Sequence, residues 1–181
     1  VVFGAGPVGL LAGAVSRAFG ATDVVFVDVF DHKLERANEF GATQTVNSSK
    51  FKSEDDLVKE IQRVLGGEQP EVVFECSGAE VCIRAGIKAC KAGGRYVQVG
   101  MGKDNVNFPI SEVVSKELQV LGTFRYCFGD YNDSVKLISE GKVDVKPLIT
   151  HRFKFQDAIK AHEFNIEHGE DVVKTIIDGP E

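Results

Sequence analysis

The chain opens with the stretch that decides its fold, Val1-Val2-Phe3-Gly4-Ala5-Gly6-Pro7-Val8-Gly9. A segment rich in small and apolar residues follows as far as Phe19, and a second apolar run, Val24 to Val27, ends at Asp28. This order predicts a strand, a glycine turn, a helix and a second strand that ends in an acid. Pro7 suits the first turn of the helix, because the N–H that proline lacks would be unpaired there anyway.

The three glycines have separate physical roles in such a unit. Gly4 permits the tight turn after the strand, Gly6 lets a pyrophosphate approach the backbone, and Gly9 lets the helix pack against the strand. The start of the helix offers unpaired N–H groups and the positive end of the helix dipole to phosphates. The stretch therefore predicts a dinucleotide-binding site. The alternative is a strand–turn–helix unit whose glycines serve packing alone.

Asp28 predicts which dinucleotide is bound. It lies 19 residues after Gly9, at the end of the second predicted strand. A carboxylate there can accept hydrogen bonds from both hydroxyls of an adenine-bound ribose, and it would repel a 2′-phosphate. We therefore expect NAD rather than NADP. The other interpretation of Asp28 is a helix cap for the segment that follows.

Composition sets limits on the class of protein. The 181 residues suit one domain with a small appendage, and 43% hydrophobic with 27% charged residues is ordinary for a globular protein. A net charge of −6 without a Lys/Arg cluster predicts no nucleic-acid partner. No apolar run approaches the roughly 20 residues that span a bilayer, so no membrane partner is predicted.

The four cysteines lack metal-ligand spacing and lie among apolar or small residues. They predict buried free thiols and a cytoplasmic location. The chain has no initiating Met and opens inside its first predicted strand. We therefore expect a natural N-terminal portion to precede it.

The rest of the chain alternates strands with helices up to about residue 123. This alternation predicts an α/β fold with a doubly wound parallel sheet, the Rossmann fold, in strand order 3-2-1-4-5-6. After Gly122 the pattern changes. We expect a helix over about 130–140, an extended stretch over 145–149, a helix over 155–165 and a last strand over 172–177, for which the sequence identifies no partner in the large sheet.

With these residues in hand, the chain resembles the medium-chain dehydrogenase/reductase family, and within it the sorbitol and xylitol (polyol) dehydrogenases. The resemblance covers essentially the whole chain. The segments that carry it are Gly4-Ala5-Gly6-Pro7-Val8-Gly9, Glu75-Cys76-Ser77-Gly78, Val97-Gln98-Val99-Gly100-Met101-Gly102, Phe124-Arg125-Tyr126 and Val145-Lys146-Pro147-Leu148-Ile149-Thr150-His151.

The resemblance implies two regions and a set of contacts. Residues 1–123 would form the NAD-binding domain, and residues 124–181 a C-terminal segment that returns to a mostly absent catalytic domain. Arg125 and Tyr126 would reach the sugar substrate. The residues expected to bind the cofactor are Gly4, Gly6, Val8, Gly9, Asp28, Lys33, Val99, Gly100, Met101, Phe124 and Arg125. Lys33 has the alternative of an ordinary solvated helix lysine, and Phe124 and Tyr126 that of core packing.

The resemblance also implies an activity. It suggests the cofactor-binding portion of a zinc-dependent, NAD-linked dehydrogenase that oxidises a polyol to a ketose, working as a dimer or tetramer. The zinc ligands and the proton relay would lie outside this chain, so we expect no catalytic and no metal-binding residue here, and an inactive isolated chain. The four histidines show no ligand spacing, and Glu75 is interpreted as closing the adenine-side pocket or pairing with a neighbour.

Two other functions stay open from the sequence. One is a stand-alone nucleotide-binding or sensing module without catalysis. The other is a zinc-free, NADPH-dependent reductase of the same superfamily, against which Asp28 argues.

Overall fold

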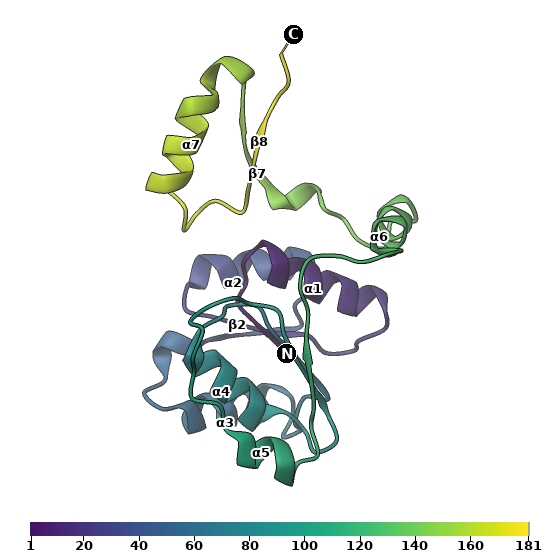
Figure 1. Cartoon of the computed structure of the whole chain (residues 1–181), viewed down its shortest axis with the longest axis vertical. Helices are drawn as coiled ribbons and strands as arrows, with labels where there is room; N and C mark the ends of the chain where they lie inside the picture. The colour runs from purple at the N-terminus through teal and green to yellow at the C-terminus, as the bar shows by residue number, and fades with distance from the viewer. Residues whose placement is uncertain (181) are drawn as a thin grey trace.

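A parallel six-stranded sheet forms the larger part of the computed structural model, which describes residues 1–180 (Figure 1). Its order is β3-β2-β1-β4-β5-β6. The strands are β1 (Val2–Phe3), β2 (Val25–Asp28), β3 (Gln44–Asn47), β4 (Val72–Glu75), β5 (Arg95–Gln98) and β6 (Gln119–Gly122). The doubly wound order predicted from the sequence is confirmed. The order reverses between β1 and β4, so the carboxyl ends of these two strands mark the place where such folds bind ligands.

Helices cover both faces of this sheet. In Figure 1, α1 (Pro7–Ala18) and α2 (Asp31–Ala37) lie on one face, and α3 (Glu54–Val64), α4 (Glu80–Ala89) and α5 (Ile110–Ser115) lie on the other. Short 3-10 turns, η1 (Asn38–Phe40) and η2 (Ser48–Lys50), flank β3. Because both faces are covered, the central strands are apolar throughout rather than alternating.

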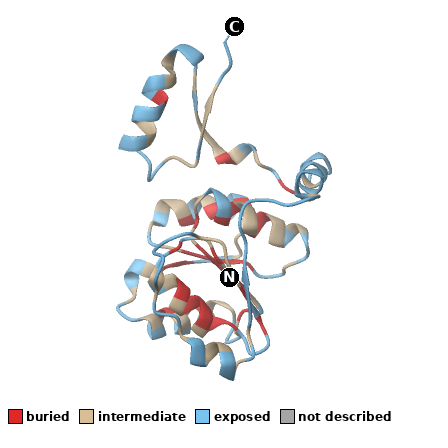
Figure 2. Cartoon of the chain, in the orientation of Figure 1, coloured by how far each residue is buried: buried red, intermediate tan, exposed pale blue. Residues whose placement is uncertain are grey.

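The core consists of two clusters, one on each face of the sheet. Phe3, Val27 and Ile87 belong to the cluster under α3 and α4. Leu10 and Phe26 belong to the cluster under α1 and α2. Each such fully buried side chain contributes about 1.5–3 kcal/mol relative to an exposed one. Figure 2 shows that buried residues concentrate in the sheet and in the helix faces next to it.

The remainder of the chain forms a smaller unit. It contains α6 (Asp130–Ser139), η3 (Lys146–Leu148), β7 (Ile149–Phe153), η4 (Phe155–Asp157), α7 (Ala158–Glu167) and β8 (Lys174–Ile177). Strands β7 and β8 pair in parallel as a separate two-stranded sheet, seen at the top of Figure 1. Val143 and Leu148 are buried in the cluster under α1 and α2, so the segment between α6 and β7 packs on that side of the larger unit.

Two expectations about this region are corrected. The stretch 145–149, expected to be extended, contains the 3-10 turn η3, since Pro147 suits a first helical turn and Asp144 Oδ1 accepts the Lys146 N–H at 2.9 Å. The last strand pairs with β7 and not with the large sheet, in which the sequence identified no partner for it. Cys127 is exposed rather than buried, although all four cysteines are free.

None of the helices in residues 1–180 is both long enough and apolar enough to cross a membrane.

Candidate functional site

The glycine turn after β1 has the shape that a phosphate-binding loop needs. Gly4 has a φ of +91°, which L-residues with a Cβ rarely adopt, and its N–H donates to Val27 O at 2.7 Å. A Cβ on Gly9 would lie only 1.8 Å from Gly4 O, whereas a Cβ on Gly6 would meet no atom within 4 Å. The turn is therefore tightly packed at Gly9 and open at Gly6. No side chain caps the start of α1, and Val8 is 56% exposed beside it.

Asp28 ties this turn to the end of β2. Its Oδ2 accepts the Ala5 N–H at 2.7 Å, while Oδ1 accepts the N–H groups of Val29 and Phe30 at 2.8 and 3.1 Å. The N-cap residue of α2 is Phe30, yet Asp28 does bind the backbone that leads into that helix. A carboxylate has about four acceptor positions, so the three backbone bonds leave capacity for a further donor.

A cavity of about 690 Å³ opens beside Gly4 and Asp28, between the carboxyl ends of β2 and β4. Its size falls in the range of about 300–1,000 Å³ that is typical of small-molecule sites. Apolar groups such as Val27, Phe51 and Val81 line it, together with the polar side chains of Ser48 and Ser77. Charged side chains also line the cavity: Lys52, Glu54, Asp55, Arg84 and Lys88. The apolar part of the wall, with the Asp28 carboxylate at its edge, fits a nucleoside, whose base is flat and whose ribose carries two hydroxyls.

Lys33 lies in the first turn of α2, and its Nζ is 4.8 Å from the centre of the Phe30 ring. This cation–π contact holds the ammonium group over the ring of Phe30, two residues after Asp28 in the chain. The neighbouring Asp31 accepts hydrogen bonds from Asn47 and Lys50, which lower the pKa of its carboxyl below the usual value. The ribose end of the candidate site thus contains charges of both signs.

Val99, Gly100 and Met101 follow β5 and lie against the loop after β4. The N–H groups of Val99 and Gly100 both donate to the Glu75 carbonyl, at 2.8 and 2.7 Å. A Cβ on Gly100 would lie 2.3 Å from the Gly78 nitrogen, so the two loops touch through their backbones. Met101 is 79% exposed at this edge.

Glu75 is the residue whose role the sequence left most open. Its side chain is fully buried and accepts hydrogen bonds from Ser77, Gly78 and Gln98. It therefore pairs with neighbours, one of the two interpretations made from the sequence. Burial, reinforced by the Glu75 charge, raises the pKa of the adjacent Cys76 thiol to about 12, so this cysteine is no nucleophile near neutral pH. Gln98 was missed as a participant, although its place within the segment Val97 to Gly102, which carries the family resemblance, was a usable signal.

Phe124, Arg125 and Tyr126 form a separate group after β6. Phe124 and Tyr126 are 69% and 65% exposed, so neither side chain is packed in the core. The Arg125 guanidinium lies over the Phe124 ring at 5.0 Å, and Arg125 has a φ of +59°. Strand β6 is three strands from β1, a separation of about 14 Å, so this group shares the edge of the sheet with the glycine turn without touching it.

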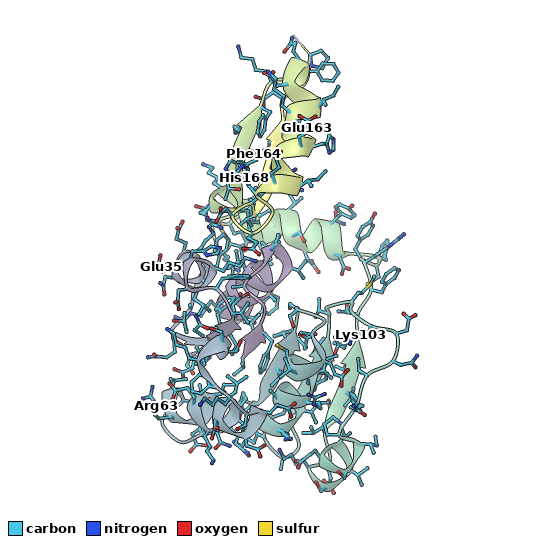
Figure 3. All side chains as sticks on the ribbon, turned by 90° about the vertical axis from the view of Figure 1, so that its left-hand side faces the viewer. Glu35, Arg63, Lys103, Glu163, Phe164 and His168 are labelled. Atoms are coloured by element: carbon cyan, nitrogen blue, oxygen red, sulfur yellow. The ribbon has the colours of Figure 1, made fainter. Side chains whose placement is uncertain are left out.

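Metal ligands are the other requirement of a zinc dehydrogenase. Between Val1 and residue 180, no three His, Cys, Asp or Glu side chains gather in a way that could hold a metal ion. The rings of His151 and His168 instead contact the Phe164 ring in tilted pairs, at centre-to-centre distances of 4.7 and 4.5 Å. Phe164 and His168 are labelled in Figure 3. These residues do not fit a zinc site, and no chemical step is assigned to zinc in this chain.

Comparisons with known proteins agree with this geometry. The family described as zinc-binding dehydrogenase matches residues 7–140. Sorbitol dehydrogenase 1 of Saccharomyces cerevisiae is 65% identical over 183 residues, which cover 100% of this chain and 51% of that protein. D-xylulose reductase of the same yeast is 55% identical, with coverage of 100% and 51%.

A solved structure, that of 2R,3R-butanediol dehydrogenase from Bacillus subtilis, matches with a TM-score of 0.88 and 29% identity, over 99% of this chain and 50% of that one. The chain thus spans about half the length of the relatives it matches. The resemblance found in the sequence is confirmed: the chain belongs to the zinc-binding dehydrogenase family of medium-chain dehydrogenases/reductases, with sorbitol dehydrogenase and D-xylulose reductase among its relatives.

Proposed function

We propose that this chain is the NAD-binding portion of a zinc-dependent polyol dehydrogenase that oxidises sorbitol or xylitol to a ketose. The observation that carries the proposal is the Asp28 carboxylate at the edge of the 690 Å³ cavity, joined to the glycine turn through Ala5. The identity of 65% to a sorbitol dehydrogenase and 55% to a D-xylulose reductase supports a polyol substrate.

Each group of residues has a task in holding NAD. The open surface at Gly6 and the uncapped start of α1 receive the pyrophosphate, because free N–H groups and the helix dipole favour anions. Asp28 accepts a ribose hydroxyl, and the base enters the apolar cavity. Val99 to Met101, with Phe124 and Arg125, border the nicotinamide. Bound NAD supplies a ring that accepts hydride, and the protein orients it.

The same proposal extends to the regions of the chain and its partners. Residues 1–123 are the NAD-binding domain, and residues 124–181 are the C-terminal segment of a catalytic domain. The exposure of Phe124 and Tyr126 supports this division, because large aromatic side chains usually lie against something. Arg125 and Tyr126 contact the polyol, zinc is held by residues outside this chain, and the full-length protein is a cytoplasmic homo-oligomer.

The test uses the full-length protein with sorbitol and xylitol, each with NAD⁺ and with NADP⁺. We expect one polyol to be oxidised to a ketose, identified by chromatography, with kcat/KM at least about tenfold higher for NAD⁺, equivalent to about 1.4 kcal/mol. A metal chelator should abolish turnover while NADH binding, followed by fluorescence, persists. Turnover with NADP⁺ at an equal rate, or chelator-resistant turnover, would contradict the proposal.

A further inference from the structure

A buried carboxylate lies beneath the carboxyl edge of the sheet, outside the set of residues proposed to touch the cofactor. Glu75 is 0% exposed. Its Oε1 accepts the Ser77 N–H at 2.9 Å and also the Ser77 hydroxyl, and its Oε2 accepts the Gly78 N–H at 2.9 Å. Every partner is a donor, as a carboxylate anion requires. The loop that follows β4, residues 76–79, is therefore folded around this group.

Gln98 extends the same network to a second loop. Its Nε2 donates to Glu75 Oε2 at 2.7 Å and to the Gly100 carbonyl at 2.7 Å. The Tyr96 hydroxyl donates to Gln98 Oε1 at 2.6 Å, which fixes the orientation of the amide. The amide of Gln98 thus joins the loop 76–79, through Glu75, to the loop 99–102.

The two loops also meet directly. A Cβ on Gly78 would lie 2.5 Å from Met101 O, and a Cβ on Gly102 would lie 2.0 Å from Gly78 O. The contact leaves no room for side chains between the loops. One loop faces the cavity beside Asp28 through Ser77 and Ala79, and the other presents Met101 at the open edge.

We propose that Glu75 and Gln98 are positioning residues that lock these two loops together, and so fix the distance between the nucleoside end and the nicotinamide end of the cofactor site. This inference rests on the proposed function. Neither residue touches the cofactor. The lock matters only for a ligand that spans both loops, because a ligand confined to the cavity needs the loop 76–79 alone.

The consequence separates this role from simple stabilisation of the fold. NAD⁺ reaches both loops, whereas AMP occupies only the nucleoside end. Cutting the link at Gln98 should weaken NAD⁺ binding and leave AMP binding nearly unchanged. A network that served only the fold would change the melting temperature without changing the ratio of the two affinities.

The experiment compares NAD⁺ and AMP by calorimetric titration in the full-length protein. For Gln98→Ala we expect the Kd of NAD⁺ to rise at least tenfold and the Kd of AMP to change less than twofold. Glu75→Gln should weaken the binding of both ligands, because Glu75 Oε2 accepts from both the Gly78 N–H and the Gln98 amide, and an NH₂ group in its place disturbs the loop 76–79 itself. Tyr96→Phe, which removes only the hydroxyl at the far end of the network, should fold normally and raise the Kd of NAD⁺ severalfold.

The matched control is Gln119→Ala on β6, an amide whose partner is Arg95 rather than either loop. It should change neither Kd. Equal weakening of NAD⁺ and AMP in the Gln98 and Tyr96 variants, or no weakening of either, would overturn the inference. If the unsubstituted protein binds AMP but not NAD⁺, the proposed function fails instead.

Discussion

The Asp28 carboxylate holds the surrounding backbone and is also the group proposed to bind the ribose. Three backbone N–H groups already donate to it, one from the glycine turn and two from the approach to α2. The sequence suggested two separate interpretations, a ribose ligand and a helix cap, and the geometry is compatible with both at once. A substitution at Asp28 therefore changes the turn as well as the charge, and its test needs a control for stability.

Asp28→Ser should reduce the preference for NAD⁺ over NADP⁺ by at least about tenfold, because a neutral hydroxyl no longer repels a 2′-phosphate. The lost backbone bonds should lower the free energy of unfolding by about 1–3 kcal/mol. Calorimetric titration with both cofactors, alongside thermal unfolding, measures the two effects. Asp31→Ser is the matched control, since Asp31 binds Asn47 and Lys50 instead. An unchanged preference in Asp28→Ser would disprove the role assigned to Asp28.

Arg125 is held in an uncommon backbone conformation at an exposed position. Its φ of +59° costs of order 1–3 kcal/mol for a residue with a Cβ, and such positions cluster at functional sites. A salt bridge with Asp130 is the competing interpretation from the sequence. Asp130 instead accepts the Cys127 N–H at 2.7 Å, and the part of the chain up to residue 180 gives Arg125 no acidic partner within 4 Å. The N–H groups of the guanidinium are therefore available to donate to a ligand.

Arg125→Ala in the full-length protein should lower kcat/KM for the polyol about tenfold or more, or about 1.4 kcal/mol, since a guanidinium can donate to cofactor and substrate together. The melting temperature should stay nearly the same, because alanine keeps the Cβ and thus the same backbone preference. Steady-state kinetics and thermal unfolding measure these. Arg63→Ala, which removes an arginine paired with Glu60 and is labelled in Figure 3, is the control. Unaltered kinetics with a clear fall in melting temperature would favour a structural role.

At the scale of elements, two glycines of the β1–turn–α1 unit differ in how closely their surroundings pack against them. Gly9 is packed so closely against Gly4 O that any Cβ forces the helix away from the strand, whereas Gly6 faces open space. The sequence assigned packing to one and ligand approach to the other. The structure agrees with that division in its contacts, and the ligand half of it stays a prediction.

Gly9→Ala should therefore lower the stability of the protein, whereas Gly6→Ala should weaken NAD⁺ binding. Gly9→Ala should lower the melting temperature, with a cost of about 1–3 kcal/mol for overpacking. Gly6→Ala should unfold like the unsubstituted protein yet bind NAD⁺ at least tenfold more weakly, because its methyl group occupies the space meant for the pyrophosphate. Thermal unfolding and calorimetry on the same pair of proteins test this. If both variants lose stability equally, the open space at Gly6 has no binding role.

Strands and helices differed in how well the sequence predicted them. Most strands of the large sheet were predictable because they contain a short apolar run followed by glycine or a polar turn, such as Val72 to Glu75 before Ser77-Gly78. The exception is β3, Gln44–Asn47, which is mostly polar. Strand β7, Ile149-Thr150-His151-Arg152-Phe153, was not, because three of its residues are polar and its sheet has only two strands. The Thr150 hydroxyl also serves the backbone there, accepting the Val173 N–H at an irregularity in the pairing. A hydrogen bond of this kind, between a side chain and the backbone, produces no periodic pattern in the sequence.

At the scale of the whole molecule, the sheet topology places residues together that the sequence motifs alone did not connect. The parallel sheet collects the ends of β1, β2, β4 and β5 at one edge, which was predictable from the alternation of strands and helices. The link through Glu75, Gln98 and Tyr96 was not, because it depends on where buried side chains of neighbouring strands meet. The aromatic side chains of residues 124–131 are a second example. The sequence shows that they are aromatic, but only the fold of residues 1–180 shows that they are exposed.

The pairing of β1 has a consequence for how the protein is made. Val2 lies next to Phe26 on one side and next to Phe74 on the other. On the ribosome, β1 can join β2 soon after Phe26 emerges, but its other edge stays unpaired until Phe74 has been synthesised. The closure of that longer loop adds little entropy cost, because the cost grows only slowly with length. The delay is instead one of time. While the chain from Phe26 to Phe74 is synthesised, the turn at Gly4 to Gly9 lacks the neighbouring strand β4, and β1 has an unpaired edge that chaperones can recognise.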